Sequence, residues 1–415
     1  MNEKQLLDDL SALIASPSLN GDAAPCHQAL LFVLERARRM GMRTGITREG
    51  DAGWAEIGQG NVTLGILAHV DVVGIGDRAK WHSDPFTLTL RDGRLYGRGV
   101  EDDKGPVLQC LYAMNTLLEE GIPLRKKLRL IVGTSEENRW TDMEHYKAQF
   151  GTPDYGFSPD AAFPVYIAEK GYADIRLYFD APELAELSAG DSPNTVPSFA
   201  RLLRRDGLRL TATGVSVHSS APEKGDNAIL RLAEQAGDAP IWRFLREMFR
   251  TAEPAVTLGL DDGSDTYRGI PVGKTVCAPT VLWLEDGQAV VNLNIRFRPG
   301  VTEAQLRAAL DRLSGSWGFR YTVAEATTPM VVDPDRPFIR LMNQVGQAFG
   351  IEPGCLSASG ATYCSTFPNH VGWGPTLPPD AGSAHEENEH TSLADFLRVT
   401  EVYTEYLRRI AQEEA

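Results

Sequence analysis

Hydrophobic and polar residues follow two distinct periods along the first third of the chain. Apolar residues recur every three to four positions in some segments, which predicts amphipathic helices, and form short runs in others, which predicts strands. The predicted helices cover residues 4–14, 27–40 and 103–121, and the predicted strands cover residues 43–48, 53–58, 62–69 and 127–137. The stretch FTLTLRDGRLYGRG adds a hairpin around an Asp-Gly turn. This alternation predicts an α/β domain with a mostly parallel sheet and helices on both faces.

The pattern changes after residue 171. The elements predicted there are a strand at 208–217, a helix at 227–236, a hairpin at 280–297, a helix at 303–313 and a strand at 319–324. The order β-α-β-β-α-β is typical of a ferredoxin-like α+β domain. Helices at 336–349 and 391–411 then resume the first domain. We therefore expect a first domain at residues 1–171 and 332–415, with a second domain inserted at residues 172–331.

Composition restricts the class of protein. The 415 residues are 42% hydrophobic and 23% charged, as in soluble globular proteins, and the length favours two domains. A net charge of −15 argues against a nucleic-acid partner. The five cysteines are scattered without a CxxC pair, which indicates reduced thiols in the cytoplasm. No apolar run approaches the roughly 18 residues of a membrane span, so we expect a soluble cytoplasmic protein that binds no membrane.

Polar residues interrupt or end the apolar elements of the first domain at several points. They are His69, Asp71, Asp102, Asp103, Glu136, Glu137, Asp160 and His385. Each alone has an ordinary alternative explanation, such as a helix cap, a solvated loop or a turn. Together they supply two imidazoles and several carboxylates at strand and helix ends. Two divalent ions about 3.5–4 Å apart need such a set, with one carboxylate shared between them.

The segments that carry these residues resemble a known family. His69-Val-Asp71, GRGVEDDKGP, GTSEEN, SPDAAFP and the late His385 resemble the aminoacylase and carboxypeptidase-G type of two-metal peptidases. KWHSDPF and FSPDAAFPVYIAEKG are similar to the peptidase V and Sapep dipeptidase branch. The similar segments follow the same order over nearly the whole chain. The resemblance implies a zinc-peptidase-like catalytic domain with an inserted lid domain.

The resemblance also implies roles for residues of the first domain. One ion is expected on His69, Asp102 and Asp160, and the other on Asp102, Glu137 and His385, with Asp102 bridging. Asp71 is expected to orient the His69 imidazole. Glu136 is implied as the general base, which takes a proton from the attacking water and gives it to the leaving amine. The family further implies a cis peptide bond between Asp102 and Asp103.

Three residues of the inserted domain are implied in substrate binding or catalysis. TGVSVHSSAPEKGDNA matches a lid motif and makes His218 the electrophile for the developing oxyanion. SPNTVPS supplies Asn194 at a substrate position, and NIRFRPG supplies Arg296 for a terminal carboxylate. The alternatives are a surface histidine at position 218, Arg298 in place of Arg296, or two arginines on a solvated strand face.

One motif departs from the branch. Its dipeptidases tend to have Gly-Gly-Thr-Tyr-x-Arg before the last ligand, whereas this chain has SGATYCST, with Cys364 and Ser365 after the tyrosine. The guanidinium that the branch places there is missing, so the resemblance does not extend to the size or charge of the preferred substrate.

The function expected from the sequence is a two-metal dipeptidase that acts on small peptides. Zinc is the first expectation for both ions, and manganese and cobalt are alternatives, because nitrogen and oxygen ligands accept all three. The alternative functions are an N-acyl-amino-acid amidohydrolase or deacetylase of the same family and a non-catalytic peptide-binding relative. The protein is expected to be a monomer or a homodimer.

Overall fold

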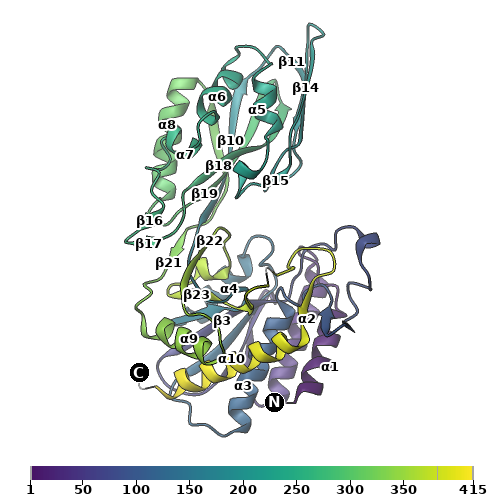
Figure 1. Cartoon of the computed structure of the whole chain (residues 1–415), viewed down its shortest axis with the longest axis vertical. Coiled ribbons are helices and arrows are strands. Elements are labelled where there is room, and N and C mark those ends of the chain that lie inside the picture. The colour runs from purple at the N-terminus through teal and green to yellow at the C-terminus, as the bar shows by residue number, and fades with distance from the viewer. Residues whose placement is uncertain (1, 381, 414–415) are drawn as a thin grey trace. The chain divides into compact units, whose positions relative to one another are not determined.

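The computed structural model describes residues 2–380 and 382–413. The chain forms two compact units, which Figure 1 shows with their elements labelled. The first unit comprises the residues up to 167, residues 332–356 and the residues from 362 onward. The second, called the inserted unit below, comprises residues 168–331 and 357–361.

A mixed 9-stranded sheet forms the centre of the first unit. Its strands lie in the order β1 (Arg43–Ile46), β2 (Ala52–Ile57), β6 (Lys127–Gly133), β3 (Thr63–His69), β7 (Tyr155–Ser158), β23 (His370–Trp373), β9 (Val165–Glu169) and β21 (Met330–Val331), and β22 (Cys355–Ala358) also pairs with β9. The neighbours β6, β3, β7 and β23 run parallel, and the flanking strands are antiparallel to them. This confirms the predicted α/β class with a parallel sheet core.

The central strands are apolar because both of their faces are covered. Leu64, Ile66 and Leu67 of β3 are fully buried, as expected for a parallel strand between two layers of helices. His69 is the last residue of β3 and pairs with Gly133, the last residue of β6. The loops that follow both strands therefore begin at the same edge of the sheet.

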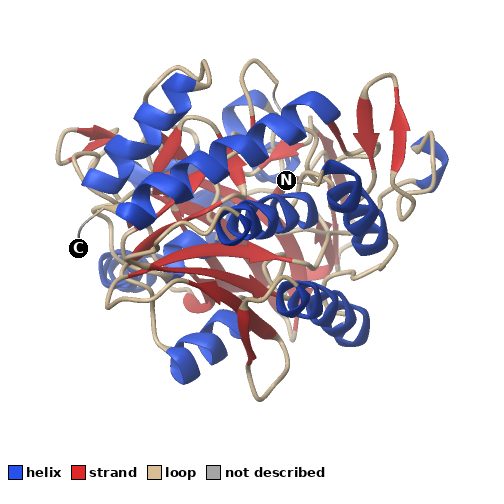
Figure 2. Cartoon of the chain, turned by 90° about the horizontal axis from the view of Figure 1, so that it is seen from below, coloured by secondary structure: helices blue, strands red, loops and turns tan. Residues whose placement is uncertain are grey.

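Helices cover both faces of this sheet (Figure 2). The layer on one face is continuous from helix to helix and contains α1 (Glu3–Ile14), α2 (Ala23–Arg39), α3 (Lys104–Glu119), α9 (Pro337–Ala348) and α10 (Leu393–Gln412). Helix α4 (Thr141–Phe150) packs on the other face, where Met143 and Tyr146 contact Leu67 and Ile131. The 3₁₀ helix η3 (Tyr363–Thr366) joins α4 there through Tyr363.

Short elements complete the first unit. The predicted Asp-Gly hairpin is formed by β4 (Thr89–Arg91) and β5 (Arg94–Tyr96), and β25 (His390–Ser392) pairs with β5. A two-stranded parallel sheet joins β8 (Ala161–Ala162) to β24 (Pro375–Thr376), and η1 (Arg78–Lys80) precedes the hairpin. Ser392 caps α10 by accepting a hydrogen bond from the backbone N–H of Asp395, as serine at a helix N-terminus commonly does.

A 7-stranded antiparallel sheet forms the core of the inserted unit. Its order is β14 (Arg209–Thr213), β13 (Phe199–Arg204), β11 (Leu184–Ala189), β18 (Val276–Glu285), β19 (Gln288–Phe297), β10 (Gly171–Asp180) and β20 (Arg320–Ala326). Its helices are α5 (Ala228–Ala233), α6 (Pro240–Phe249), α7 (Pro254–Thr257) and α8 (Glu303–Trp317), with the 3₁₀ helix η2 (Pro222–Lys224). Two short strand pairs complete the unit. In the first, β12 (Thr195–Val196) pairs with β15 (Val217–His218), and in the second, β16 (Thr266–Tyr267) pairs with β17 (Ile270–Pro271).

The sheet contains the predicted ferredoxin-like order, but its first strand is a different segment. Strands β10, β18, β19 and β20 lie in the spatial order β20-β10-β19-β18. The strand predicted at 208–217 was wrong as a single element, because the chain leaves the sheet after Thr213 and only Val217 and His218 form a further short strand. A Cβ at Gly214 would lie 1.9 Å from the backbone O of Asp226, which explains a glycine at this break.

The face of β19 that carries the polar side chains of Asn292 and Asn294 is buried. Asn292 and Asn294 are 4% and 1% exposed. Both amides donate to Oδ1 of Asp174 on the neighbouring β10, at 3.1 and 3.4 Å. Hydrogen bonds between two strands thus engage the side-chain N–H groups of both buried asparagines.

Segment 168–331 of the inserted unit begins and ends in neighbouring strands. Met330 and Val331 of β21 pair antiparallel with Glu169 and Ala168 of β9. The backbone N–H of Val332 donates to the carbonyl of Ile167 at 2.8 Å. Both connections therefore form a single hydrogen-bonded ribbon.

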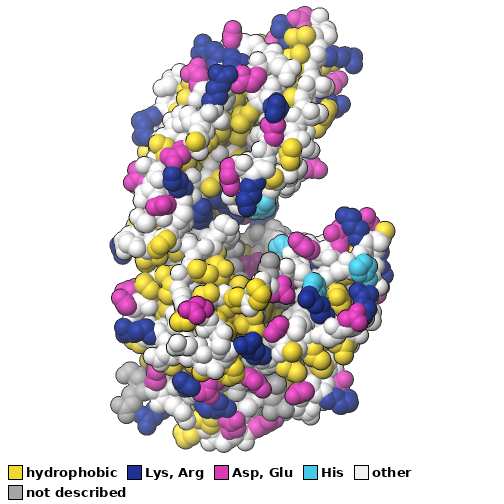
Figure 3. Space-filling model, viewed as in Figure 1, with side chains coloured by type: hydrophobic (Ala, Val, Ile, Leu, Met, Phe, Trp, Pro, Cys, Tyr) yellow, Lys and Arg dark blue, Asp and Glu magenta, His cyan; other side chains and the backbone are white. Residues whose placement is uncertain are grey.

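Charged side chains of both signs are interspersed over the face of the molecule seen in Figure 3. This distribution differs from the continuous basic surface of a typical nucleic-acid-binding protein. Within residues 2–380 and 382–413, no helix has the length and apolar character needed to cross a membrane.

Candidate metal centre

Two histidines and three carboxylates meet at the carboxyl edge of the parallel strands. They are His69, Asp102, Glu137, Asp160 and His385, the predicted ligands. Nε2 of His69 lies 2.9 Å from Oδ1 of Asp102 and 3.8 Å from Oδ2 of Asp160. Nε2 of His385 lies 2.9 Å from Oδ2 of Asp102 and 2.9 Å from Oε1 of Glu137. Asp102 therefore turns one oxygen toward each histidine, as a carboxylate shared by two ions must.

The donor set fits divalent cations. Nε2 of His69 and Oδ1 of Asp102 are buried, and neither has a hydrogen-bond partner within the described residues. Ligand atoms of His69, Asp102 and Glu137 all lie within 4.8 Å of one another, and so do those of His69, Glu136 and Asp160. Imidazole nitrogen and carboxylate oxygen are ligands that zinc, manganese and cobalt accept.

The electrostatics of the cluster agree with this donor chemistry. Burial, with the nearby charge of Asp102, raises the pKa of Asp160 to about 8. Burial and the charge of Asp160 raise the pKa of Glu136 well above its usual range. Burial alone would lower the pKa of His69, but its contacts with Asp102 and Asp71 hold it well above the usual value. A bound cation would favour the ionised acids and replace the histidine protons.

Asp71, which the sequence predicted to orient the His69 imidazole, also contacts a second loop. Nδ1 of His69 lies 2.9 Å from the backbone O of Asp71 and 3.4 Å from its Oδ1. The Asp71 carboxylate also accepts the backbone N–H groups of Glu136 and Glu137, each at 3.2 Å. Asp71 thus connects the end of β3 to the loop after β6.

The two glutamates of this loop lie in different environments. Glu137 points toward His385, and Asn20 donates to its backbone carbonyl at 3.0 Å. Oε1 of Glu136 is buried and has no hydrogen-bond partner among the residues described. Trp140 donates from Nε1 to the backbone carbonyl of Glu136 at 2.6 Å. The Glu136 backbone is therefore held while one carboxylate oxygen stays unengaged beside the ligand cluster.

The same loop rests on a buried aspartate that the sequence did not indicate. Oδ2 of Asp142 accepts the backbone N–H groups of Thr134 at 2.7 Å and Ser135 at 2.9 Å, and it also accepts the hydroxyl of Tyr363. Asp142 and Tyr363 are 0% and 1% exposed. Tyr363 lies in the SGATYCST motif, but its partner begins a distant helix, where an acidic residue is ordinary.

The peptide bond between Asp102 and Asp103 is cis, which confirms the sequence expectation. The Asp103 carboxylate is fully buried and accepts the backbone N–H of His69 at 3.0 Å. The two adjacent aspartates thus point to different parts of the site, Asp102 toward both histidines and Asp103 toward the β3 backbone.

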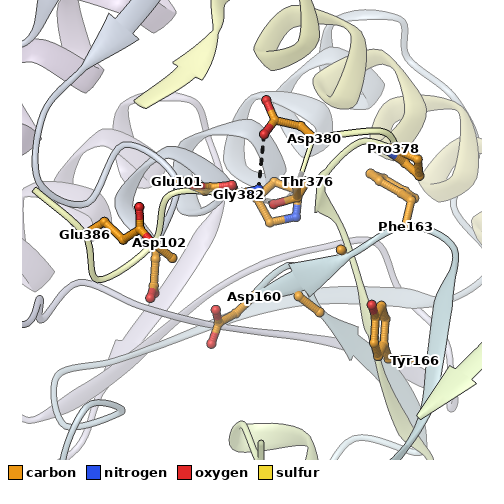
Figure 4. Close-up of a pocket in the computed structure, with 14 residues that line it drawn as sticks. Glu101, Asp102, Asp160, Phe163, Tyr166, Thr376, Pro378, Asp380, Gly382 and Glu386 are labelled. Carbon is orange, nitrogen blue, oxygen red and sulfur yellow. Dashed lines mark hydrogen bonds between the residues drawn. The ribbon is translucent and has the colours of Figure 1, made fainter. Parts of the chain in front are cut away.

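A cavity of about 460 Å³ opens beside the ligands. Figure 4 shows Asp102, Asp160 and Glu386 on one side of it and the rings of Phe163 and Tyr166 on the other. The remaining lining residues are Glu101, Ala161, Ala162, Pro375, Thr376, Pro378, Asp380, Gly382 and Ala384. Among the residues that the structure describes, the lining includes several carboxylates and no lysine or arginine.

The three predicted residues of the inserted unit lie near one another. Thr195 of β12 pairs with His218 of β15, and the backbone N–H of Ser219 donates to the carbonyl of Asn194 at 2.9 Å. Nη2 of Arg296 donates to Oδ1 of Asn194 at 3.1 Å. One corner of the inserted unit therefore carries an imidazole, an amide and a guanidinium.

Local contacts orient His218 and Arg296. Nδ1 of His218 lies 2.7 Å from Oγ of Ser220 and accepts the Ser220 backbone N–H at 3.2 Å. The Arg296 guanidinium lies over the ring of Tyr172, 4.6 Å from its centroid. This partly buried stacking differs from a fully solvated strand face.

Arg298, the alternative to Arg296, is engaged elsewhere. Its guanidinium donates to both carboxylate oxygens of Asp261 at 2.8–3.1 Å and to Asp262 at 2.6 Å. Arg298 is 6% exposed. Its donors are therefore used by a bidentate ion pair inside the unit, which favours Arg296 for a substrate carboxylate.

The sequence is similar to a known peptidase family and to proteins named as dipeptidases. The family model described as Peptidase family M20/M25/M40 matches residues 65–409. The Bacillus subtilis protein named "Putative dipeptidase YtjP" is 30% identical over 444 residues, covering 94% of this chain and 93% of that protein. A Staphylococcus epidermidis protein named "Putative dipeptidase" is 26% identical over 469 residues, covering 99% and 98%.

Solved structures share the fold over the whole chain. Aminoacylhistidine dipeptidase from Vibrio alginolyticus has a TM-score of 0.67 at 14% identity, with 99% of this chain and 97% of that chain covered. Human carnosine dipeptidase 1 has a TM-score of 0.64 at 16% identity, with the same coverage. The Bacillus subtilis YXEP protein, described as a dinuclear metal binding peptidase, has a TM-score of 0.57 at 11% identity, with 99% and 98% covered.

Proposed function

Because this chain belongs to peptidase family M20/M25/M40, we propose that it is a metal-dependent dipeptidase acting on peptides with two free ends. The observation that carries the proposal is the cluster of two histidines and three carboxylates at the carboxyl edge of the sheet. The full-length similarity to the two proteins named as dipeptidases supports the choice of substrate.

The ligand roles follow from the distances within the cluster. His69 and Asp160 would hold one ion, Glu137 and His385 the other, and Asp102 would contact both through its two oxygens. When bound, two divalent cations supply positive charge that polarises a carbonyl and lowers the pKa of water. Zinc is the proposed metal, with manganese and cobalt as alternatives for the same donors.

Glu136 is proposed as the general base. Its unengaged oxygen would take a proton from the attacking water as the water oxygen bonds to the peptide carbon. The same carboxyl group would then give this proton to the amine nitrogen as the carbon–nitrogen bond breaks. Asp71 and Asp142 would keep Glu136 in place through the backbone of its loop.

Residues of the inserted unit are proposed to contact the substrate. His218 would stabilise the developing oxyanion, with its ring oriented by Ser220. Arg296 would bind the terminal carboxylate, and Asn194, which already accepts from Arg296, would share that contact.

The cavity beside the ligands favours a dipeptide over an N-acyl amino acid. The carboxylates of Glu101, Asp380 and Glu386 line it together with the ligands Asp102 and Asp160. A free α-ammonium group gains favourable charge interactions in such a cavity, whereas an acyl group carries no charge to use them. This composition supports peptidase over amidohydrolase activity.

The test is hydrolysis of a dipeptide panel beside N-acetylated and C-amidated versions, with zinc, manganese or cobalt added to metal-free protein. We expect metal-dependent cleavage of the free dipeptides and weak cleavage of N-acetylated ones. Preferred cleavage of N-acetyl amino acids would assign the amidohydrolase function instead. Metal binding without hydrolysis of either class would indicate a non-catalytic relative.

A further inference from the structure

Arg98 and Glu389 form a buried ion pair beside the loop that carries Asp102. Neither side chain belongs to the proposed metal ligands. Arg98 and Glu389 are 1% and 0% exposed. Nη1 of Arg98 donates to Oε2 of Glu389 at 2.7 Å, and Nη2 of Arg98 donates to the carbonyl of Gly74 at 3.1 Å. Burying both charges carries a large desolvation cost, so the ion pair alone is weak evidence for added stability. The other hydrogen bonds of the two side chains indicate their role.

The remaining contacts of Glu389 all go to the loop that ends in Asp102. Its Oε2 accepts the backbone N–H of Gly99 at 2.9 Å. Its Oε1 accepts the backbone N–H groups of Glu101 at 2.9 Å and Asp102 at 3.1 Å. Three backbone N–H groups of this loop are therefore bound by a single carboxylate, and one of them belongs to Asp102, the residue that is proposed to contact both ions.

Glu101 makes the reverse connection. Its Oε2 accepts the backbone N–H of Ser383 at 2.6 Å and the Ser383 hydroxyl at 3.0 Å. Ser383 closes a loop with His390, because its Oγ accepts the His390 N–H at 2.8 Å and lies 2.9 Å from the His390 carbonyl oxygen. His385 lies inside that loop.

Each of two chain segments thus provides a buried carboxylate that binds the backbone of the other. Segment 98–102 carries Asp102 and holds segment 383–390 through Glu101. Segment 383–390 carries His385 and holds segment 98–102 through Glu389. We call these two carboxylates, with Arg98, the cross-clamp.

We propose that Glu389 is a positioning residue that fixes Asp102 and His385 relative to each other before metal binds. The inference rests on the proposed function only in taking Asp102 and His385 as metal ligands. Because the two ligands lie 283 positions apart in sequence by their numbers, local chain stiffness cannot hold them 2.9 Å apart. The cross-clamp supplies this restraint, and ligands held in place bind metal with a smaller ordering cost.

The test measures metal affinity of the full chain by isothermal titration calorimetry with zinc and with manganese. Glu389→Gln keeps the shape of the side chain but has one strong acceptor oxygen in place of two and no charge for Arg98. We expect its affinity for at least one of two ions to fall about 10–100-fold, the usual scale when a partner behind a ligand is removed. The metal-free variant should still fold, with a melting temperature lowered by the buried charge of Arg98, which has lost its carboxylate partner.

Glu387→Gln is the matched control. Glu387 lies two positions before Glu389 in the same segment, and its Oε1 accepts from the backbone of Asp77 and from Lys80 rather than from segment 98–102. This variant should bind both ions with unchanged affinity. Glu389→Asp retains the charge but shortens the side chain, and we expect an affinity between those of wild type and Glu389→Gln.

Three results would overturn the proposal: unchanged metal affinity in Glu389→Gln, an equal fall in Glu387→Gln, or failure of both Glu389 variants to fold without metal. The last result would make Glu389 a structural residue. Because calorimetry reads metal binding and not hydrolysis, a wild-type protein that binds two ions but cleaves no dipeptide would refute the proposed function and leave the cross-clamp in place.

Discussion

At the scale of single residues, the adjacent acids Glu136 and Glu137 lie in different environments. Glu136 and Glu137 are neighbours in the sequence SEEN, and both donate their backbone N–H to the Asp71 carboxylate. Yet the Glu137 carboxylate contacts His385, while one Glu136 oxygen is left without a hydrogen bond within the described part of the chain. One side chain suits a ligand and the other suits a proton carrier.

This difference leads to a prediction about paired variants. Glu136→Gln should keep both ions and lower kcat roughly 10²-fold or more, because an amide cannot accept the proton of the attacking water. Glu137→Gln should instead weaken metal binding. Metal content from elemental analysis and kcat for a cleaved dipeptide check both statements. Loss of metal in Glu136→Gln with retention in Glu137→Gln would reverse the two roles.

At the scale of elements, buried carboxylates bind backbone N–H groups at several points along the carboxyl edge of the sheet. Asp103 accepts from β3, Asp71 and Asp142 accept from the loop after β6, and Glu389 accepts from the loop before α3. These N–H groups lie where the regular strand pairing ends, and buried acids satisfy them. The loops are thereby held by hydrogen bonds of the charge-assisted kind.

Tyr363→Phe tests the Asp142 contact through pH. Burial raises the pKa of Asp142 to about 6, and the hydroxyl of Tyr363 opposes this by donating to the ionised carboxylate. Removing the hydroxyl should raise the Asp142 pKa further. Since the ionised form is the one that accepts the loop N–H groups, the acid limb of the kcat–pH profile should move to higher pH.

Tyr146→Phe is the control for this variant. Tyr146 belongs to the same apolar cluster, but its hydroxyl accepts from Arg129 at 3.2 Å and does not contact Asp142. Its acid limb should stay where the wild-type limb lies. An acid limb that is identical in Tyr363→Phe and wild type would separate Asp142 from the active loop.

At the scale of the whole molecule, the proposed chemistry is divided between two separately packed units. The metal ligands and the base belong to the first unit, whereas His218, Asn194 and Arg296 belong to a corner of the inserted unit. Variants in the inserted unit should therefore change catalysis or substrate binding without changing metal content.

His218→Ala should lower kcat by roughly 10²–10³, the scale for losing one oxyanion donor. Metal content should equal that of wild type. His27→Ala, a variant of a half-buried histidine whose Nδ1 lies 2.7 Å from the Gly50 carbonyl, is the control and should keep full activity. Near-normal turnover by the His218→Ala protein would remove this residue from the mechanism.

Arg296→Ala should mainly raise KM for dipeptides with a free carboxylate and have little effect on the corresponding amides. The reason is the loss of the paired guanidinium donors for that carboxylate. Arg201→Ala, on the exposed side of β13, should leave KM unchanged for both. Equal effects of Arg296→Ala on free and amidated dipeptides would show that the guanidinium does not read the terminus.

Sequence patterns predicted the helices, strands and candidate ligands whose environment depends on residues nearby in the chain. The apolar run of β3 ends in a polar His69, so strand and candidate ligand can both be inferred from a few neighbouring letters. Asp142 and Glu389 could not be inferred in this way, because their partners are backbone N–H groups of distant loops, which leave no mark in the sequence. Similarly, the alternation in 208–217 has the period of one strand, and only the tertiary contact at Gly214 shows where the strand ends.

The ribbon formed by β9 and β21 makes segment 168–331 a place where the chain can tolerate a change in length. Ile167 and Val332 are hydrogen-bonded to each other, so segment 168–331 begins and ends at a single junction of the first unit. Closing a loop across this junction costs only slightly more as residues are added. We therefore expect that segment 168–331 can be trimmed or enlarged, by gene fusion or in the laboratory, with the parallel strands that end at His69 and Gly133 left as they are.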